Sequence, residues 1–448
     1  MMILGVAGAG LLLFLVVLQR NKPSTGTVAG HRDLKCTRRS QGHRVVLGHR
    51  ASTTWMTLPS RLLAPQDHSV LIVGPTQSGK TSSLVIPTIA AWDGPILVAS
   101  VKDDLVVATA ALRGERGEVG VVDPTRSHGS FSRCVDPVAL IGDFASAKRV
   151  AFSLCDANME GPQSSESQFW NQMAAKTLSV LCFAASLSTG SLHEVISWVN
   201  HGESAPWLAL IGASQDNAAI EIAQACARRD ERQAASIAAT MEAVLEPFSL
   251  ITSHPSIDVE HFLDSFHSMY FCAPAFEQRR YRAMFVLAIE EIIRRAYEQA
   301  QREGGRLSKP LLVVLDEAAA IAPLRELDVI AATCASHGIV LLSVFQDLTQ
   351  IHARWPGRAD SIVNNHRTRV LLSGSSDPLV GTMVNQALGV MSASDQEYSF
   401  DIRTLRSHRG IVISGALQPV RLALMKPRIP KRKRLARLDG WRSRSAST

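Results

Sequence analysis

The feature that most constrains the fold is the run Gly-Pro-Thr-Gln-Ser-Gly-Lys-Thr at residues 74–81, directly after the apolar run 69–73. The apolar run has the length and the β-branched residues of a buried strand. The spacing G-x-x-x-x-G-K-T is that of a phosphate-binding loop, whose glycines let backbone N–H groups face phosphate oxygens. A preceding strand, and a following helix expected from about Thr81, separate it from a chance Gly-rich turn. The pattern predicts an α/β P-loop NTPase fold.

The loop residues have distinct expected roles. We expect Lys80 to place its charge near the β- and γ-phosphates of ATP, and the Thr81 hydroxyl to bind Mg²⁺. ATP and Mg²⁺ are therefore the expected cofactors. The expected nucleotide-binding set is Gly74, Pro75, Thr76, Gln77, Ser78, Gly79, Lys80 and Thr81.

Two further apolar runs end in polar residues that suit the same chemistry. Residues 311–315 lead into Asp316 and Glu317. We expect Asp316 to hold Mg²⁺ and Glu317 to act as general base toward the attacking water, although such a pair also occurs at a helix N-cap. Residues 338–345 end at Gln346, which would sense the γ-phosphate or orient the water, or else bond only to loop backbone.

The pattern of strands and helices divides the chain. Strand-like runs at 96–100, 120–124, 268–272 and 368–372 alternate with helical segments, which predicts a mostly parallel, RecA-like sheet. Residues 145–262 show helical periodicity without a good strand, and five of them are expected near one helical face: Phe169, Met173, Val180, Leu181 and Ala184. We therefore expect a P-loop domain formed by 61–144 and 263–425, with an all-α domain inserted at 145–262.

The two ends differ in charge from the body. Residues 1–18 carry no charged side chain; 19–50 hold eight Lys/Arg and one acid, and 426–448 hold nine and one. The remaining 30 bases and 38 acids form an acidic body, unlike a uniformly basic DNA-coating protein. Seven scattered cysteines without a C-x-x-C pair indicate reduced thiols in a cytosolic body.

The N-terminal apolar segment predicts a membrane anchor. Eighteen helical residues span about 27 Å, close to a bilayer core of roughly 30 Å. The bases follow the apolar run, which disfavours a signal peptide and places the body in the cytoplasm by the positive-inside rule. A buried helix is the alternative. We expect a single-pass anchor at 1–19 in the inner or plasma membrane, a basic juxtamembrane linker at 20–60, and a basic tail at 426–448 that binds phosphates or acidic lipid, or is simply solvated.

Taken together, these segments resemble the type IV secretion coupling proteins, the conjugative coupling ATPases of the TraG/TraD type with a TraM-recognition-type C-terminal half. The resemblance covers roughly residues 65–425. It is carried by the loop block 74–105, by Val122-Asp123-Pro124, Gln168-Phe169-Trp170, Leu315-Asp316-Glu317-Ala318, Ile321-Ala322-Pro323-Leu324, Phe345-Gln346-Asp347-Leu348-Thr349-Gln350-Ile351 and Asn364-Asn365.

The resemblance implies a membrane-anchored hexameric ATPase that brings relaxase-bound single-stranded DNA, or protein, to secretion channel components. It also implies a nucleotide-sensing role for Gln346 and an arginine acting in trans, for which Arg367 and Arg369 are candidates. The chain departs from the family at Ser100, where an Asp is common, in its single apolar span, and in its basic tail.

Two other functions stay open at this stage. The helical segment would suit an ATP-regulated docking platform for protein cargo that pumps no DNA. An FtsK-like double-stranded DNA translocase is the other alternative, disfavoured by the helical insertion and by the lack of an obvious C-terminal winged-helix module.

Overall fold

The computed structural model describes residues 43–50, 61–123, 132–133, 135–157, 164–188, 190–249, 258–274, 276–389, 401–415 and 417–424. The expected anchor at 1–19 and the basic tail at 426–448 lie outside these residues. Within the described ranges, no helix combines the length and the apolar character that crossing a membrane requires.

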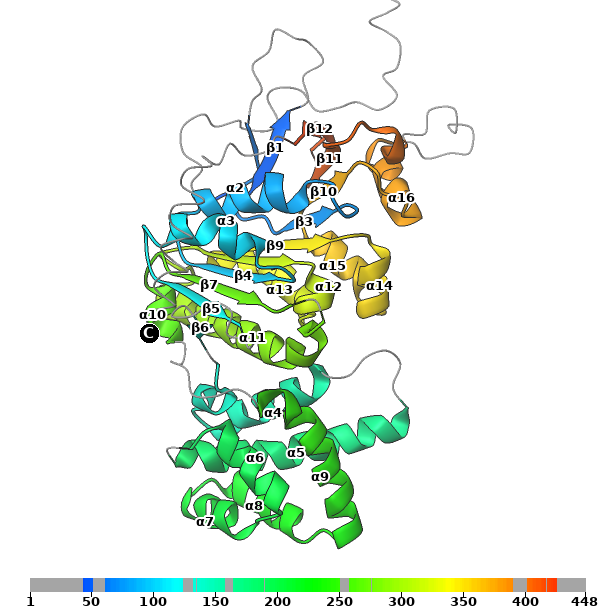
Figure 1. The fold of residues 1–448 in the computed structure, drawn as a ribbon. Helices are drawn as coiled ribbons and strands as arrows, with labels where there is room; N and C mark the ends of the chain where they lie inside the picture. The colour runs from blue at the N-terminus through cyan, green and yellow to red at the C-terminus, as the bar shows by residue number, and fades with distance from the viewer. Residues whose placement is uncertain are drawn as a thin grey trace, which may run out of the picture.

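A single twelve-stranded sheet runs through the described part of the chain, in the order β2-β1-β12-β11-β10-β3-β9-β8-β4-β7-β5-β6 (Figure 1). The strands are β1 (Val46–Arg50), β2 (Arg61–Leu63), β3 (Val70–Val73), β4 (Ile96–Ser100), β5 (Val119–Val122), β6 (Ser132–Arg133), β7 (Ser268–Cys272), β8 (Leu311–Asp316), β9 (Ile339–Phe345), β10 (Thr368–Leu372), β11 (Arg409–Ser414) and β12 (Val420–Ala423).

The sheet is mixed. From β10 to β6 every pairing is parallel, as the alternation of strands and helices predicts. From β2 to β10 every pairing is antiparallel, which the sequence analysis did not foresee. The expectation of a linker at 20–60 is wrong for residues 46–50, because β1 pairs with β12 and β2 and its Val46 and Leu47 are buried.

Both faces of the parallel block are apolar, which explains why its strands are continuous apolar runs. Successive side chains alternate between two hydrophobic clusters: Leu71 and Val73 of β3 belong to one, and Val70 and Ile72 to the other. Burial of each such side chain contributes about 1.5–3 kcal/mol. These layers hold the strand ends, and the polar residues that follow them, in fixed positions.

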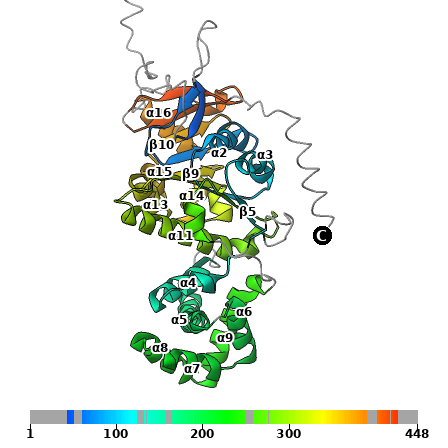
Figure 2. The same ribbon diagram turned by 90° about the vertical axis from the view of Figure 1, so that its left-hand side faces the viewer.

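Helices cover both faces and extend below the sheet (Figures 1 and 2). The helical elements are η1 (Thr81–Val85), α2 (Ile86–Ala91), α3 (Asp104–Arg113), η3 (Pro137–Leu140), α4 (Phe144–Ala157), α5 (Ser165–Leu187), α6 (Leu192–His201), α7 (Ala205–Ala213), α8 (Asn217–Ala227), α9 (Glu231–Leu245), η4 (Glu246–Phe248), α10 (Val259–Leu263), α11 (Gln278–Arg302), α12 (Ala318–Ile321), α13 (Leu327–Thr333), η5 (Cys334–His337), α14 (Thr349–Arg354), α15 (Ala359–Asn365), α16 (Pro378–Ala387) and η7 (Ile402–Thr404).

The elements α4 to α9 form a helical bundle that lies at one end of the molecule in both views. The central helix is α5, which packs against α4, α6, α7, α8 and α9. Its N-cap Ser164 accepts a hydrogen bond from the N–H of Ser167, and its buried stretch is rich in alanine, which lets neighbouring helices approach closely. Of the residues expected near one helical face, Val180 and Leu181 are buried, whereas Phe169, near the start of α5, is 47% exposed.

Candidate functional site

The loop of residues 74–81, which carries the phosphate-binding motif, connects β3 near the middle of the sheet to η1. All four residues of β3 are buried, and the N–H of Gly74 continues the ladder by donating to the carbonyl oxygen of Phe345 at the end of β9, at 3.2 Å. A Cβ atom on Gly74 would lie 2.8 Å from the Cβ of Leu372 on β10. Position 74 therefore needs glycine because the neighbouring strand leaves no room for a side chain.

The backbone of the loop turns through two left-handed residues. Gly79 has φ +93° and Gln77 has φ +61°, and the Ser78 N–H donates to the Pro75 carbonyl oxygen at 3.3 Å. The glycine at 79 was expected from the motif, whereas the left-handed Gln77 was not. Lys80 is buried and its ammonium group donates to the carbonyl oxygens of Gly74 and, at 2.8 Å, Pro75. Burial lowers the pKa of Lys80, which the nearby charges of Asp316 and Glu317 oppose.

The helix after the loop begins at Thr81 but differs from the regular α-helix expected there. Residues Thr81–Val85 form a π-helical turn, and α2 starts at Ile86. The N–H of Ile86 donates to the carbonyl oxygen of Thr81, five positions earlier, and Pro87 in the first turn of α2 has no N–H to donate to a residue four positions earlier.

Asp316 and Thr81 face each other at the edge where the strands end. The Thr81 hydroxyl donates to Asp316 Oδ2 at 3.1 Å. Burial raises the pKa of Asp316 to about 6, partly offset by the hydrogen bond from Thr81. Asp316 Oδ1 is buried and has no hydrogen-bond partner among the described residues. A hydroxyl beside a buried carboxylate with an unused oxygen is a donor set that suits Mg²⁺.

Glu317 and Gln346 lie side by side. Glu317 has φ +61°, an uncommon conformation for a residue other than glycine, and caps the start of α12. The side-chain amide of Gln346 donates to Glu317 Oε1 at 3.3 Å. Because β3, β9 and β8 are adjacent and parallel, their carboxyl ends place the loop, Gln346 and the Asp316-Glu317 pair at one edge. The alternative that the Gln346 side chain bonds only to loop backbone is therefore wrong, because its amide bonds to the Glu317 carboxylate.

The two arginine candidates lie elsewhere. Thr368 pairs with Val70 and Leu371 with Val73, so the loop after Val73 lies beside the carboxyl end of β10. Arg367 and Arg369 are at its amino end, three to five residues away, or about 10–17 Å along the strand. Arg367 is exposed, and Arg369 donates to Asn364 Oδ1 at 3.5 Å. Neither residue can reach the phosphate loop of its own chain.

Several contacts at this edge were missed by sequence reasoning. Gln350 accepts the N–H of Gln346 at 3.4 Å, and Asp377 Oδ2 accepts the N–H groups of Leu348 at 2.7 Å and Thr349 at 3.2 Å. The Gln-x-x-x-Gln spacing was a signal for Gln350, but no local pattern marks Asp377. Ser100, the position where the family commonly has Asp, pairs in register with Asp316 on β8 and accepts the Lys102 N–H at 3.3 Å.

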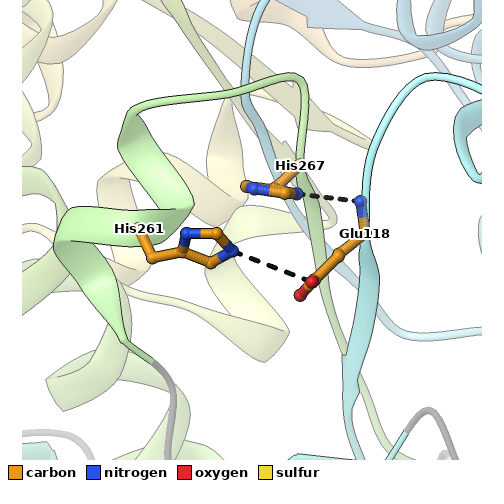
Figure 3. Close-up of side chains that lie close together, drawn as sticks. All are labelled: Glu118, His261 and His267. Atoms are coloured by element: carbon orange, nitrogen blue, oxygen red, sulfur yellow. Dashed lines mark hydrogen bonds and ion pairs between the residues drawn. The ribbon is translucent and has the colours of Figure 1, made fainter.

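A second group of polar side chains lies at the opposite edge of the sheet: Glu118, His261 and His267, whose ligand-type atoms are within 4.8 Å of one another (Figure 3). The N–H of Glu118 donates to His267 Nδ1 at 2.8 Å, so the neutral ring carries its proton on Nε2. A metal-binding imidazole needs a lone pair on one nitrogen and a proton on the other. Here the lone pair is already used by the backbone, so this group lacks the arrangement of a three-ligand metal site.

Known proteins share this sequence pattern and fold. A family model described as type IV secretory system conjugative DNA transfer matches residues 22–428. The conjugal transfer protein TraG of Escherichia coli is 22% identical over 330 residues, covering 66% of this chain and 51% of TraG. VirD4 of Rhizobium rhizogenes is 31% identical over 104 residues, covering 22% of this chain and 15% of VirD4. The matched part of this chain thus spans about half the length of TraG and a smaller share of VirD4.

Solved structures of the bacterial conjugative coupling protein TrwB have the same fold. The unbound form of TrwBdeltaN70 matches with a TM-score of 0.63 at 14% identity, covering 82% of this chain and 88% of that one. TrwB in complex with ADP and Mg²⁺ matches with a TM-score of 0.60 at 12% identity, covering 91% and 99%. At this level of identity the likeness concerns the fold. On the match over residues 22–428, the chain belongs to the type IV secretory system conjugative DNA transfer family.

Proposed function

We propose that this chain is an ATPase that acts as the coupling protein of a conjugation-type secretion system, driving relaxase-bound single-stranded DNA or protein into the channel. The observation that carries the proposal is the meeting of Lys80, Thr81, Asp316, Glu317 and Gln346 at one edge of the sheet. Support also comes from TrwB, which has the same fold and has been solved with ADP and Mg²⁺ and with a non-hydrolysable ATP analogue.

The proposed chemistry follows from these side chains. The loop N–H groups and Lys80 bind the phosphates of ATP. Thr81 and Asp316 would hold Mg²⁺, which neutralises phosphate charge when bound. Glu317 accepts the proton of the attacking water, and the Gln346 amide, already donating to Glu317, orients that water.

Assembly and location are further parts of the proposal. A homo-hexamer would place the nucleotide between subunits, so that an arginine of one chain could act on its neighbour. Arg367 and Arg369 stay candidates only in trans, because their strand end is remote from their own loop. The apolar segment 1–18 would anchor the assembly in the inner membrane with its body in the cytoplasm, where it would contact channel components.

ATP hydrolysis by the purified full-length chain tests the proposal, measured with and without single-stranded DNA. Glu317→Gln is the inactive reference and should show no ATP turnover, since glutamine keeps the shape of the side chain but cannot accept a proton. Glu203→Gln, at an exposed position between α6 and α7, is the matched control and should behave as wild type. Equal turnover by the Glu317 variant and wild type would refute the assigned base.

The response to DNA separates the remaining functions. Stimulation by single-stranded DNA that weakens as salt rises would favour a nucleic-acid motor. Steady turnover without any response would favour the docking platform for protein cargo. Stimulation by double-stranded DNA alone would favour the FtsK-like alternative.

A further inference from the structure

Arg325 lies eight residues after Glu317, where the chain leaves α12 and approaches two other helices. Its guanidinium group forms an ion pair with Asp156, near the end of α4 in the helical bundle. Its backbone N–H donates to Glu290 Oε1, on α11, at 3.3 Å. The other oxygen of Glu290 accepts the Ser153 hydroxyl of α4 at 3.1 Å. Arg325, which follows β8 and α12 along the chain, therefore contacts both α4 of the bundle and α11.

The two carboxyl groups at this junction are poorly solvated. Burial raises the pKa of Asp156 and of Glu290. The charge of Arg325 opposes the shift at Asp156, and at Glu290 the main opposing effects are hydrogen bonds from the Arg325 backbone and the Ser153 hydroxyl. Glu326 adds a further negative charge near Glu290. The Arg325 side chain thus supplies the cation that pairs with Asp156, while Glu290 is held by the backbone N–H of Arg325 and by the Ser153 hydroxyl.

The segment between Glu317 and Arg325 is held along its length, so a displacement at one end reaches the other. Its backbone carbonyl groups accept hydrogen bonds from neighbouring elements: Arg282 of α11 donates to the Ala320 oxygen at 3.1 Å, and the indole of Trp355, at the end of α14, donates to the Leu324 oxygen at 2.8 Å. Arg358 donates to the Arg325 oxygen at 2.9 Å. These bonds leave the segment little freedom to absorb a movement of Glu317 locally.

We propose that Arg325 is a positioning residue, and that its contacts with Asp156 and Glu290 couple the state of the hydrolysis site at Glu317 to the helical bundle through α4. The inference rests on the proposed function, since it assumes that nucleotide binds at the loop of residues 74–81. Binding of a substrate to the bundle would then affect Glu317 through the same contacts, because coupling between two sites is reciprocal.

Hydrogen exchange of α4 measures this coupling directly. Exchange at residues 144–157 is followed in the full-length chain with and without a non-hydrolysable ATP analogue. We expect the analogue to change protection of α4 in wild type, and to have no effect there in Arg325→Ala. Arg325→Lys, which keeps the charge, should restore part of the response. The matched control is Arg306→Ala, which removes an arginine paired with Asp67 at the amino end of β3 and should respond as wild type.

A kinetic readout distinguishes positioning from general destabilisation. In Arg325→Ala, stimulation of ATP hydrolysis by single-stranded DNA should fall about fivefold or more, which is within the usual range of coupling between two sites. The KM for ATP should stay within about twofold of wild type. Asp156→Asn removes the partner charge with little change of shape and should give the same pattern, so a poorly folded Arg325→Ala does not decide the outcome.

Each outcome has a distinct meaning. If wild type does not bind the analogue, the proposed function fails and this inference with it. If the analogue binds but protection of α4 does not change, the inference alone is overturned. It is equally overturned if the Arg325 and Asp156 variants keep the wild-type response, or if Arg306→Ala loses it to the same degree.

Discussion

Replacing Asp316 with asparagine should stabilise the metal-free protein at neutral pH while removing a residue proposed for catalysis. Asp316 is 6% exposed, and burial raises the pKa of its carboxyl group from the ordinary 3.8 to about 6. The negative charge of Glu317 acts in the same direction, whereas the Thr81 hydroxyl and Lys80 act against it. The ionised carboxylate is therefore disfavoured in the folded chain, and an amide of the same shape removes that cost.

The magnitude follows from the pKa difference. A difference of about two units corresponds to about 3 kcal/mol. The folded pKa lies above the unfolded one, so this stability is fully present below about pH 4 and is lost as pH rises through about 6. Asparagine does not titrate, so the gain from Asp316→Asn should grow between these pH values. For a chain of this length the full gain corresponds to a rise in Tm of roughly 3 °C.

Thermal unfolding in EDTA without nucleotide, at pH 4.5 and pH 7.5, measures the effect. Asp360→Asn is the control, because its side chain is 89% exposed and should show no such gain. Addition of Mg²⁺ with ATP should reverse the order and favour wild type, since the cation needs the carboxylate. A variant less stable than wild type at pH 7.5, or a difference that does not change with pH, would refute the reasoning.

Three other predictions test separate parts of the account. Lys80→Ala should lose ATP binding in an equilibrium titration, and affinity near wild type would remove the loop from the site. Burial lowers the pKa of His366 to about 4, so stability present above about pH 6.5 is lost as pH falls toward 4. His366→Gln should reduce this loss of unfolding free energy by about 3 kcal/mol in denaturant titrations across this pH range. An unchanged dependence of unfolding free energy on pH would contradict the prediction. A chain lacking residues 1–18 should no longer float with membranes; continued flotation would assign anchoring to the basic segments or a partner.

Local pattern was enough to predict the centre of the fold. The strands β3, β8 and β9 are continuous apolar runs because both of their faces are buried, and each ends in residues of distinctive chemistry. Since parallel strands end at the same edge, the motifs at these strand ends predicted that the loop, Asp316, Glu317 and Gln346 share one edge of the sheet. The adjacency of β3, β9 and β8 itself was found only in the structure.

Features that depend on distant contacts were not accessible in this way. The strands β1 and β12 are short and contain glycine or charged residues, and their pairing is fixed by partners more than 370 positions apart. The contact of Arg325 with Asp156 spans 169 positions and that of Glu118 with His267 spans 149. The π-helical turn of residues Thr81–Val85 was likewise not predicted.

The most direct test of the central claim is ATP hydrolysis by the full-length chain, titrated with single-stranded DNA, beside Glu317→Gln and Glu203→Gln. The account predicts turnover that DNA stimulates and salt suppresses, its loss in the Glu317 variant, and no change in the control. Turnover that is indifferent to DNA at every salt concentration, or that survives in Glu317→Gln, would contradict the account of a nucleic-acid coupling ATPase that uses this base.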